Sequence, residues 1–348
     1  MMNEYEFENY LKKSLSNSIS SQNPSNEVKN KARKLSPSYF NDLKEKLLMK
    51  YEDKSLKDVM DCRSCRTSYG DVLKITKKEK INFNIVDNNF KNQINSNLKL
   101  LPGIGLKTEE NLKNKGYMTI EELTCHDRYS DVASKFIRNM AELSFSELLD
   151  VLDNNKYSKK CRDNIIKCIS LTDSENFRFM DIETKGLSNV PIILIGVGEI
   201  KNNKIISSQY FLQDYDEEAS IIDAYLSHLD EDSIHVTFNG KTFDVPFIKN
   251  RCRYNRINAN LDLAHLDLMY FAKRLWAKDL PNCRLQTIER ELLGIEREGD
   301  VPGQYIPGYW DTYKEKNNIG PVVPIIEHNA HDVISLASFL DKMYRDVN

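Results

Sequence analysis

The sequence predicts an α/β domain in its C-terminal half, preceded by a mostly helical region. From residue 177 onward, short apolar strands alternate with helices, as in an α/β sheet. Residues 98–170 carry apolar side chains at helical spacing instead, and the polar turn-formers of 171–176 separate the two patterns. We therefore expect four parts: a loosely ordered lead at 1–35, a helix plus small β-hairpin at 36–97, a helical module at 98–172 and an α/β domain at 173–348.

The composition is that of a soluble globular protein, with 40% hydrophobic and 29% charged residues among 348. No apolar run reaches the length of a membrane span, and the start of the chain lacks the apolar core of a signal peptide. The seven cysteines are scattered, which argues against a disulfide framework. We expect a cytoplasmic protein without membrane association.

The net charge of −3 conceals an uneven distribution. Residues 1–170 hold 30 Lys/Arg and 24 Asp/Glu, whereas residues 171–348 hold 19 and 28. The basic half could contact phosphates, and the acidic half could still approach nucleic acid if its carboxylates held cations. Both values are also ordinary for soluble domains, so charge alone does not decide the function.

The N-terminal region contains two recognisable elements. Residues 1–35 are rich in Ser, Asn and Lys, which favours loose order. Residues 36–51 carry apolar side chains at helical spacing behind a capping serine and predict a helix. Residues 70–87 alternate on both sides of a Lys-rich stretch, and we expect a hairpin that turns within that stretch.

The segment "LLPGIGLKTEENLKNKGY", residues 100–117, resembles a helix-hairpin-helix motif. Gly103 and Gly105 would let the backbone approach a phosphate closely, the second helix would present its N-terminal N–H groups, and Lys107 would add charge. Such hairpins contact DNA backbones without reading sequence. The alternative is a hairpin that only mediates domain or protein contacts.

The pair Cys62–Cys65 is half of a possible zinc site. Cys125 and His126 could complete it, but the spacing fits no common zinc finger, and unbound thiols are the favoured interpretation. Cys161 and Cys168 are expected in a helix core.

The apolar pattern of the C-terminal half predicts a series of strands and helices. Strands are expected at 177–182, 191–200, 204–212 and 233–238, and helices at about 217–228, from 242, and at 327–340.

Four carboxylates stand at notable positions in this half. Asp181 and Glu183 lie two residues apart at a strand end, and therefore on one face, where like charges repel unless a cation lies between them. Asp244 follows a strand and an Asn-Gly turn. Asp332 lies one helical turn after His328 and on the same face.

These residues resemble the motifs of the DEDD exonucleases, and the YprB-like branch of that family is the nearer resemblance. The supporting segments follow in order: "FRFMDIETKG", "NGKTFD", "YFAKRLW", "CRLQTIERELLGIERE", "DVPGQYIPGYWDTY" and "HNAHDVISL". The resemblance covers residues 177 to about 344. It implies a ribonuclease H-like fold, a mixed sheet flanked by helices, for the C-terminal domain.

The resemblance also implies a two-metal site. Asp181, Glu183, Asp244 and Asp332 match the four family acids and would hold two ions, Mg²⁺ or Mn²⁺, about 3.5–4 Å apart for phosphodiester cleavage. His328 is the candidate general base. The better-known branches carry Tyr four residues, or His five residues, before the last acid. This chain has His at four residues before it and Glu327 at five.

Several nearby residues have two interpretations. Asp267 could support the ligands or cap a helix. Asn239 and Lys241 could bind substrate phosphates or serve the turn alone. Tyr305 and Trp310 could stack on a base over the cleft or pack against the domain.

The resemblance implies a 3′–5′ exonuclease that acts on DNA, with a role in DNA repair and a helicase as a possible partner. The alternatives are a non-catalytic or structure-specific nucleic-acid-binding protein and an endonuclease that cleaves RNA–DNA hybrids. RNA as substrate, the polarity of digestion and the oligomeric state stay open.

Overall fold

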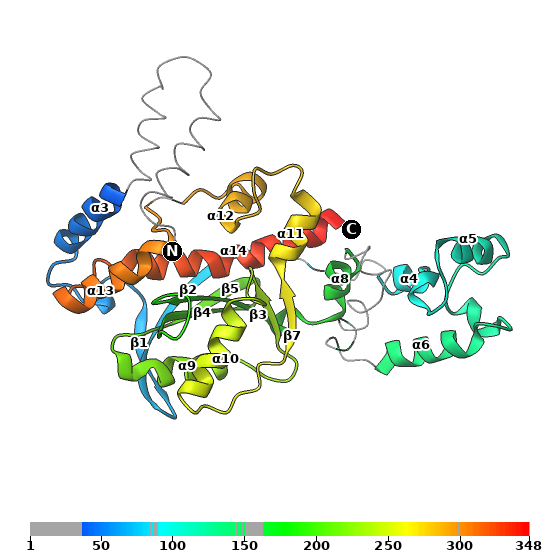
Figure 1. Cartoon of the computed structure of the whole chain (residues 1–348), viewed down its shortest axis with the longest axis horizontal. Coiled ribbons are helices and arrows are strands. Elements are labelled where there is room, and N and C mark those ends of the chain that lie inside the picture. The colour runs from blue at the N-terminus through cyan, green and yellow to red at the C-terminus, as the bar shows by residue number, and fades with distance from the viewer. Residues whose placement is uncertain are drawn as a thin grey trace, which may run out of the picture.

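The computed structural model describes residues 37–83, 85, 90–142, 145, 147, 149, 163–297 and 299–347. These residues form one mixed β-sheet with helices on both faces and a helical module at one end (Figure 1). The predicted lead at 1–35 lies outside the described residues. No described helix is long and apolar enough to cross a membrane.

The sheet has seven strands in the order β1-β2-β5-β4-β3-β6-β7. In this sheet order, each neighbouring pair from β1 through β2, β5 and β4 to β3 is antiparallel. The pairs β3–β6 and β6–β7 are parallel. The strands are β1 (Cys62–Thr67), β2 (Gly70–Lys80), β3 (Phe177–Thr184), β4 (Ile192–Lys201), β5 (Lys204–Phe211), β6 (Ile234–Thr237) and β7 (Ala264–Asp267). The predicted ribonuclease H-like mixed sheet flanked by helices is confirmed.

The predicted N-terminal hairpin exists, but its predicted turn in the Lys-rich stretch is wrong. β2 runs straight through that stretch, and its hairpin partner is β1, joined to it by a turn after Thr67. The backbone of the Lys-rich stretch pairs with β5, with Lys77 opposite Ser207, so the long-range pairing outweighs the local polarity.

The β1–β2 hairpin therefore extends the sheet of the C-terminal domain. Because β2 pairs along its length with β5, strands from the predicted parts 36–97 and 173–348 share one sheet. The predicted boundaries between 36–97, 98–172 and 173–348 stay a prediction about folding units. They do not coincide with the limits of the sheet, which contains strands from the first and the last of these parts.

Helices cover both faces of the sheet. In chain order, the α-helices of the described residues are α3 (Pro37–Lys50), α4 (Phe90–Asn95), α5 (Leu106–Asn114), α6 (Ser130–Glu142), α8 (Asp163–Cys168), α9 (Glu218–Leu226), α10 (Asp244–Tyr254), α11 (Leu268–Trp276), α12 (Leu285–Ile288), α13 (Ile306–Lys316) and α14 (Val323–Val347). Of these, α4, α5 and α6 lie in the module at the end of the molecule (Figure 1). The long α14 lies across β3, β4 and β5, and α9 and α10 lie on the opposite side of the sheet (Figure 1).

Alternation along β3 divides the core between the two faces. Phe177 and Phe179 pack in the cluster that contains the apolar side of α14, whereas Met180 and Ile182 pack in the cluster of α9 and α10. By the same alternation, Asp181 and Glu183 lie on the α14 face of the strand.

The aromatic residues Tyr305 and Trp310 pack against the rest of the protein. The indole of Trp310 is fully buried and donates from Nε1 to the carbonyl of Leu212 at 3.1 Å. Tyr305 stacks on Phe40 of α3 with ring centroids 4.4 Å apart. Both rings therefore pack against the protein, as the packing interpretation expects, and the fully buried Trp310 is not placed for base stacking.

The described residues of the module at 98–172 are mostly helical, as predicted, and the segment before the glycine turn forms only a short 3₁₀ turn. Leu100 lies in a 3₁₀ turn, Leu98–Leu100, and α5 begins at Leu106. Cys168 is buried as predicted, whereas Cys161 lies outside the described residues.

Candidate active site

β3 delivers the first two carboxylates. Asp181 pairs with Gly196 of β4 and Glu183 with Leu194, and the register shifts directly after Glu183. Glycine at 196 is required by the neighbouring helix, because a Cβ there would lie 2.1 Å from the side chain of Asn329. The sheet thus leaves room for α14 to come close to Asp181.

The side chain of Asn329 on α14 lies in the space above Gly196. Its Nδ2 donates to Asp181 Oδ2 at 2.8 Å and to the Asp181 carbonyl at 3.0 Å. Its Oδ1 accepts from Gln209 Nε2 at 2.9 Å, and Gln209 also donates to the carbonyl of Ile326 at 2.8 Å. These buried bonds tie β5, α14 and β3 together and orient the Asp181 carboxylate.

α10 delivers the third carboxylate, Asp244, at its first residue. Asp244 is buried, and its Oδ1 accepts from the backbone N–H of Ile182 at 3.2 Å, between the two acids of β3. This bond fixes Asp244 beside the end of β3.

The turn before α10 is held by Asp267. Its two oxygens accept from the N–H groups of Asn239 at 2.8 Å and Lys241 at 3.1 Å, and it caps α11 by accepting from Met269 N at 3.2 Å. Asn239 has a left-handed φ of 72° and bonds with its side chain to Thr242. The structure therefore gives Asp267 a turn and cap role, and the phosphate contacts predicted for Asn239 and the exposed Lys241 stay proposals.

α14 delivers His328 and Asp332 to the same place. His328 Nε2 lies 3.7 Å from Glu183 Oε1 and 3.6 Å from Asp332 Oδ2. Its Nδ1 is 2.5 Å from Asp300 Oδ1. The imidazole is buried, and it turns Nε2 toward the carboxylates while Asp300 holds the other nitrogen.

Burial and repulsion from neighbouring carboxylates raise the pKa values of Asp181, Glu183 and Asp244. Burial, together with Asp332, Glu183 and Asp244, places the pKa of Asp181 well above its usual range. Burial raises the pKa of Glu183 to about 8 and that of Asp244 to about 7. Burial opposes the charged form of His328, but Asp332, Asp300 and Glu183 together raise its pKa to about 9. The four acids are thus close enough to repel each other.

Three residues from the segment before α13 complete the site, and sequence reasoning did not select them. Arg297 donates to Glu289 and to Asp332, and His328 Nδ1 donates to Asp300. Glu289 and Arg297 are both buried. The sequence did contain a signal for these three residues. They are charged residues inside two segments that carry the family resemblance, "ERELLGIERE" for Glu289 and Arg297 and "DVPG" for Asp300.

The donor chemistry fits a divalent cation. Clustered carboxylate oxygens are the ligands that Mg²⁺ and Mn²⁺ prefer, and an ion among them would relieve the repulsion that raises the pKa values. Within the described part of the chain, however, no three His, Cys, Asp or Glu side chains are placed so that they could hold a metal ion as they stand. One oxygen of Asp332 bonds to Arg297 instead.

The remaining predicted residues lie elsewhere. Gly103 and Gly105 lie in the turn before α5, and Lys107 lies in the first turn of α5, in the module at the end of the molecule (Figure 1). Cys62 and Cys65 lie on β1 and Cys125 in a 3₁₀ turn of that module, which does not assemble the zinc site.

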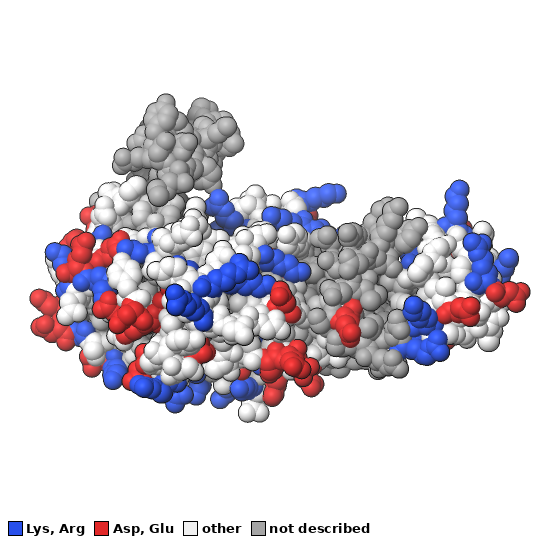
Figure 2. All heavy atoms as spheres, turned by 60° about the horizontal axis from the view of Figure 1, so that its bottom comes forward, with Lys and Arg blue, Asp and Glu red and all other residues white. Residues whose placement is uncertain are grey.

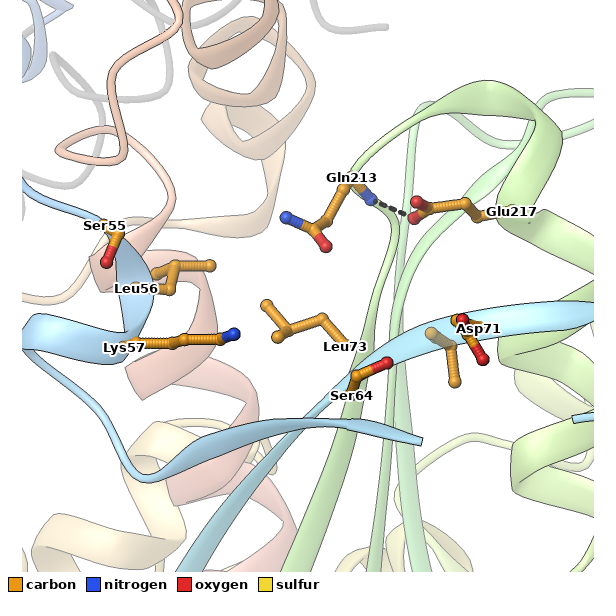
Figure 3. A pocket seen from close by; sticks show the side chains of 9 residues that line it. Ser55, Leu56, Lys57, Ser64, Asp71, Leu73, Gln213 and Glu217 are labelled. Atoms are coloured by element: carbon orange, nitrogen blue, oxygen red, sulfur yellow. Dashed lines mark hydrogen bonds between the residues drawn. The ribbon is translucent and has the colours of Figure 1, made fainter. Parts of the chain in front are cut away.

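A cavity of about 360 Å³ lies against the β1–β2 hairpin, on the side of the 3₁₀ turn Leu56–Asp58 (Figure 3). Its lining includes Lys57, Asp71 and Glu217, and the Lys57 side chain extends into it. None of the candidate carboxylates lines this cavity, so it is separate from the site.

Comparisons with known proteins cover the same part of the chain. The family model described as RNase_H superfamily matches residues 178–344. The uncharacterized protein YprB of Bacillus subtilis (strain 168) is 31% identical over 180 residues, which are 50% of this chain and 43% of that protein. The chain thus spans less than half the length of this curated relative. Residues 178–344, with their mixed sheet and their acids at the end of β3, belong to the ribonuclease H-like superfamily as a YprB-like member.

Proposed function

We propose that the C-terminal domain is a nuclease that depends on divalent cations and acts as a 3′–5′ exonuclease on DNA. The observation that carries the proposal is the approach of Glu183 and Asp332 to the buried His328. Asp181 bonds to Asn329, the residue after His328, and Asp244 bonds to the backbone between Asp181 and Glu183. Membership of the ribonuclease H-like superfamily supports nucleic acid as the substrate. The direction of digestion, the preference for DNA, a role in DNA repair and a helicase partner rest on the resemblance to the DEDD exonucleases.

In this proposal the four carboxylates hold two Mg²⁺ or Mn²⁺ ions. Ions bound there would supply positive charge to the phosphoryl oxygens and lower the pKa of water. Once bound ions offset the carboxylate charges that raise its pKa, His328 would take the proton of the attacking water at Nε2. Nε2 is the nitrogen that faces Glu183 and Asp332, because Asp300 engages Nδ1. The buried Asp300–His328 pair keeps the imidazole in one orientation for this transfer.

The helical module would hold the nucleic acid outside the site. Gly103 has a left-handed φ of 84°, and a Cβ there would meet nothing within 4 Å, so the hairpin backbone is open to an approaching phosphate. Ile104 is fully buried and anchors the hairpin. Basic side chains project from this end of the molecule among acidic ones (Figure 2). We propose backbone contacts from Gly103, Gly105 and Lys107.

One observation favours a second function, a nucleic-acid-binding protein without catalysis. The bond between Arg297 and Asp332 occupies an expected ligand with a cation that belongs to the protein itself. If that bond kept divalent cations out, the fold would bind nucleic acid without cleaving it.

A cleavage assay separates the two functions. The full chain is incubated with end-labelled single-stranded DNA, RNA and an RNA–DNA hybrid in Mg²⁺ or Mn²⁺, beside Asp244→Asn and the control Asp262→Asn. Asp262 is an exposed carboxylate paired with Lys249, away from the site. We expect single nucleotides from DNA with the wild type and the control, and none with Asp244→Asn. Equal cleavage by Asp244→Asn contradicts the proposal, and internal fragments of the hybrid indicate an endonuclease.

A further inference from the structure

Arg297 is held in one orientation by Glu289. The guanidinium bonds through Nη2 to Glu289 Oε1 at 2.5 Å and through Nε to Glu289 Oε2 at 2.7 Å. Only 6% of the Arg297 side chain and 1% of the Glu289 side chain are exposed. Glu289 opens the π-helical turn Glu289–Leu293, which follows α12. Two parallel bonds to a planar fork fix both the position and the direction of the guanidinium.

The same Nη2 also donates to Oδ1 of Asp332. The other oxygen, Asp332 Oδ2, lies 3.6 Å from His328 Nε2, which is 3.7 Å from Glu183 Oε1. The two oxygens of Asp332 therefore have different surroundings. Oδ1 is occupied by Arg297, and Oδ2 faces the space that it shares with Glu183 and His328.

The Glu289–Arg297 pair orients the Asp332 carboxylate and adds no net charge to the site. A buried ion pair of this kind is weak evidence for stability, because removing both charges from water costs about as much as their attraction returns. A hydrogen-bonding partner behind a metal ligand, in contrast, orients that ligand and raises its affinity for the ion. The second role accounts for a neutral pair placed directly behind Asp332.

We propose that Arg297, clamped by Glu289, is a positioning residue that fixes Asp332 so that it offers Oδ2 alone to a divalent cation. This inference rests on the proposed function, since it assigns a role toward the cation that the carboxylates would hold. It also gives the Arg297–Asp332 bond a purpose that is compatible with cation binding.

The test measures Mn²⁺ affinity in the full chain, by the electron paramagnetic resonance signal of free Mn²⁺. The double variant Glu289→Gln/Arg297→Met removes the pair without changing the net charge. We expect its Mn²⁺ affinity to fall about 10- to 100-fold. The matched control is Arg290→Met/Glu291→Gln, which removes the exposed pair next to it and should bind Mn²⁺ as the wild type does.

A second variant keeps the test decisive if the double variant does not fold. Arg297→Lys retains the positive charge but loses the fork, and we expect it to fold with a smaller but measurable loss of Mn²⁺ affinity. Wild-type affinity, or tighter binding, in a folded Arg297→Lys or double variant overturns this inference and leaves the proposed function standing. Absence of Mn²⁺ binding in the wild type overturns both.

Discussion

At the residue scale, Asp181 lies where burial and three other acids oppose its charged form. An aspartate whose pKa is raised by folding loses stabilising free energy as the pH rises from the unfolded value of 3.8 through the higher folded value. At neutral pH, the transfer of the Asp181 carboxyl group into the site therefore destabilises the metal-free fold. Functional sites commonly carry such a cost in stability.

We predict that Asp181→Asn melts at a higher temperature than the wild type at pH 7 in EDTA. Mn²⁺ should raise the melting temperature of the wild type, because it binds only the folded state, and should have little effect on the variant. Thermal unfolding followed by circular dichroism measures both effects. Asp262→Asn, at an exposed position, should behave as the wild type. A lower melting temperature for Asp181→Asn in EDTA would contradict the repulsion inferred among the acids.

Asp300 bonds to the imidazole of His328, the candidate general base. His328→Ala should lower the cleavage rate by about 10²- to 10⁴-fold, the usual contribution of general acid–base catalysis. Asp300→Asn should lower it by a smaller factor, about 10- to 100-fold, because the imidazole loses its charged partner at Nδ1. Single-turnover cleavage with saturating Mn²⁺ measures both rates. A rate for Asp300→Asn equal to that of the wild type would remove Asp300 from the proposed mechanism.

At the element scale, the position of α14 depends on the absence of a side chain at Gly196. A Cβ at this position would lie 2.1 Å from Asn329 Oδ1 and 3.0 Å from Val333. We predict that Gly196→Ala destabilises the fold by about 1–3 kcal/mol, because the added methyl group pushes α14 away from β4. Cleavage should fall with it, since Asn329 orients Asp181.

The matched control for this helix contact is Gly186→Ala. A Cβ at Gly186 would lie 3.5 Å from Val190, an ordinary van der Waals distance. Urea unfolding of the two variants should therefore give a clear difference in midpoint. Equal midpoints would show that α14 adjusts to the added methyl group at no cost.

The hairpin before α5 allows a test of the proposed DNA contact. Lys107→Glu should weaken binding to duplex DNA and reduce the slope of log affinity against log salt, because one phosphate contact is lost. Fluorescence anisotropy with labelled duplex DNA across salt concentrations measures this slope. Glu110→Gln, an exposed change on the same helix, should leave the slope unchanged. An unaltered slope in Lys107→Glu would favour the alternative of a protein-contact hairpin.

At the scale of the whole molecule, the sheet depends on the N-terminal hairpin. β2 covers the edge of β5, and Val72, Leu73 and Ile75 are buried in the core beside α9 and β4. An uncovered apolar edge strand promotes association between chains. We predict that a fragment comprising residues 173–348 aggregates or unfolds at a lower temperature than a fragment comprising residues 37–348. Size-exclusion chromatography and thermal unfolding compare the two, and an equally stable, monomeric short fragment would refute this dependence.

Local patterns in the sequence predicted four strands and three helices of the C-terminal half, because apolar alternation and helical spacing are local properties, but they did not predict β7, α11, α12 or α13. The resemblance to the DEDD exonucleases selected five candidate site residues: Asp181, Glu183, Asp244, His328 and Asp332. Only the tertiary structure decided that β1 and β2 join this sheet. It alone also placed Arg297, Glu289 and Asp300 against His328 and Asp332. These contacts depend on long-range strand pairing and on the path of an irregular segment, and neither is encoded in the local pattern of side chains.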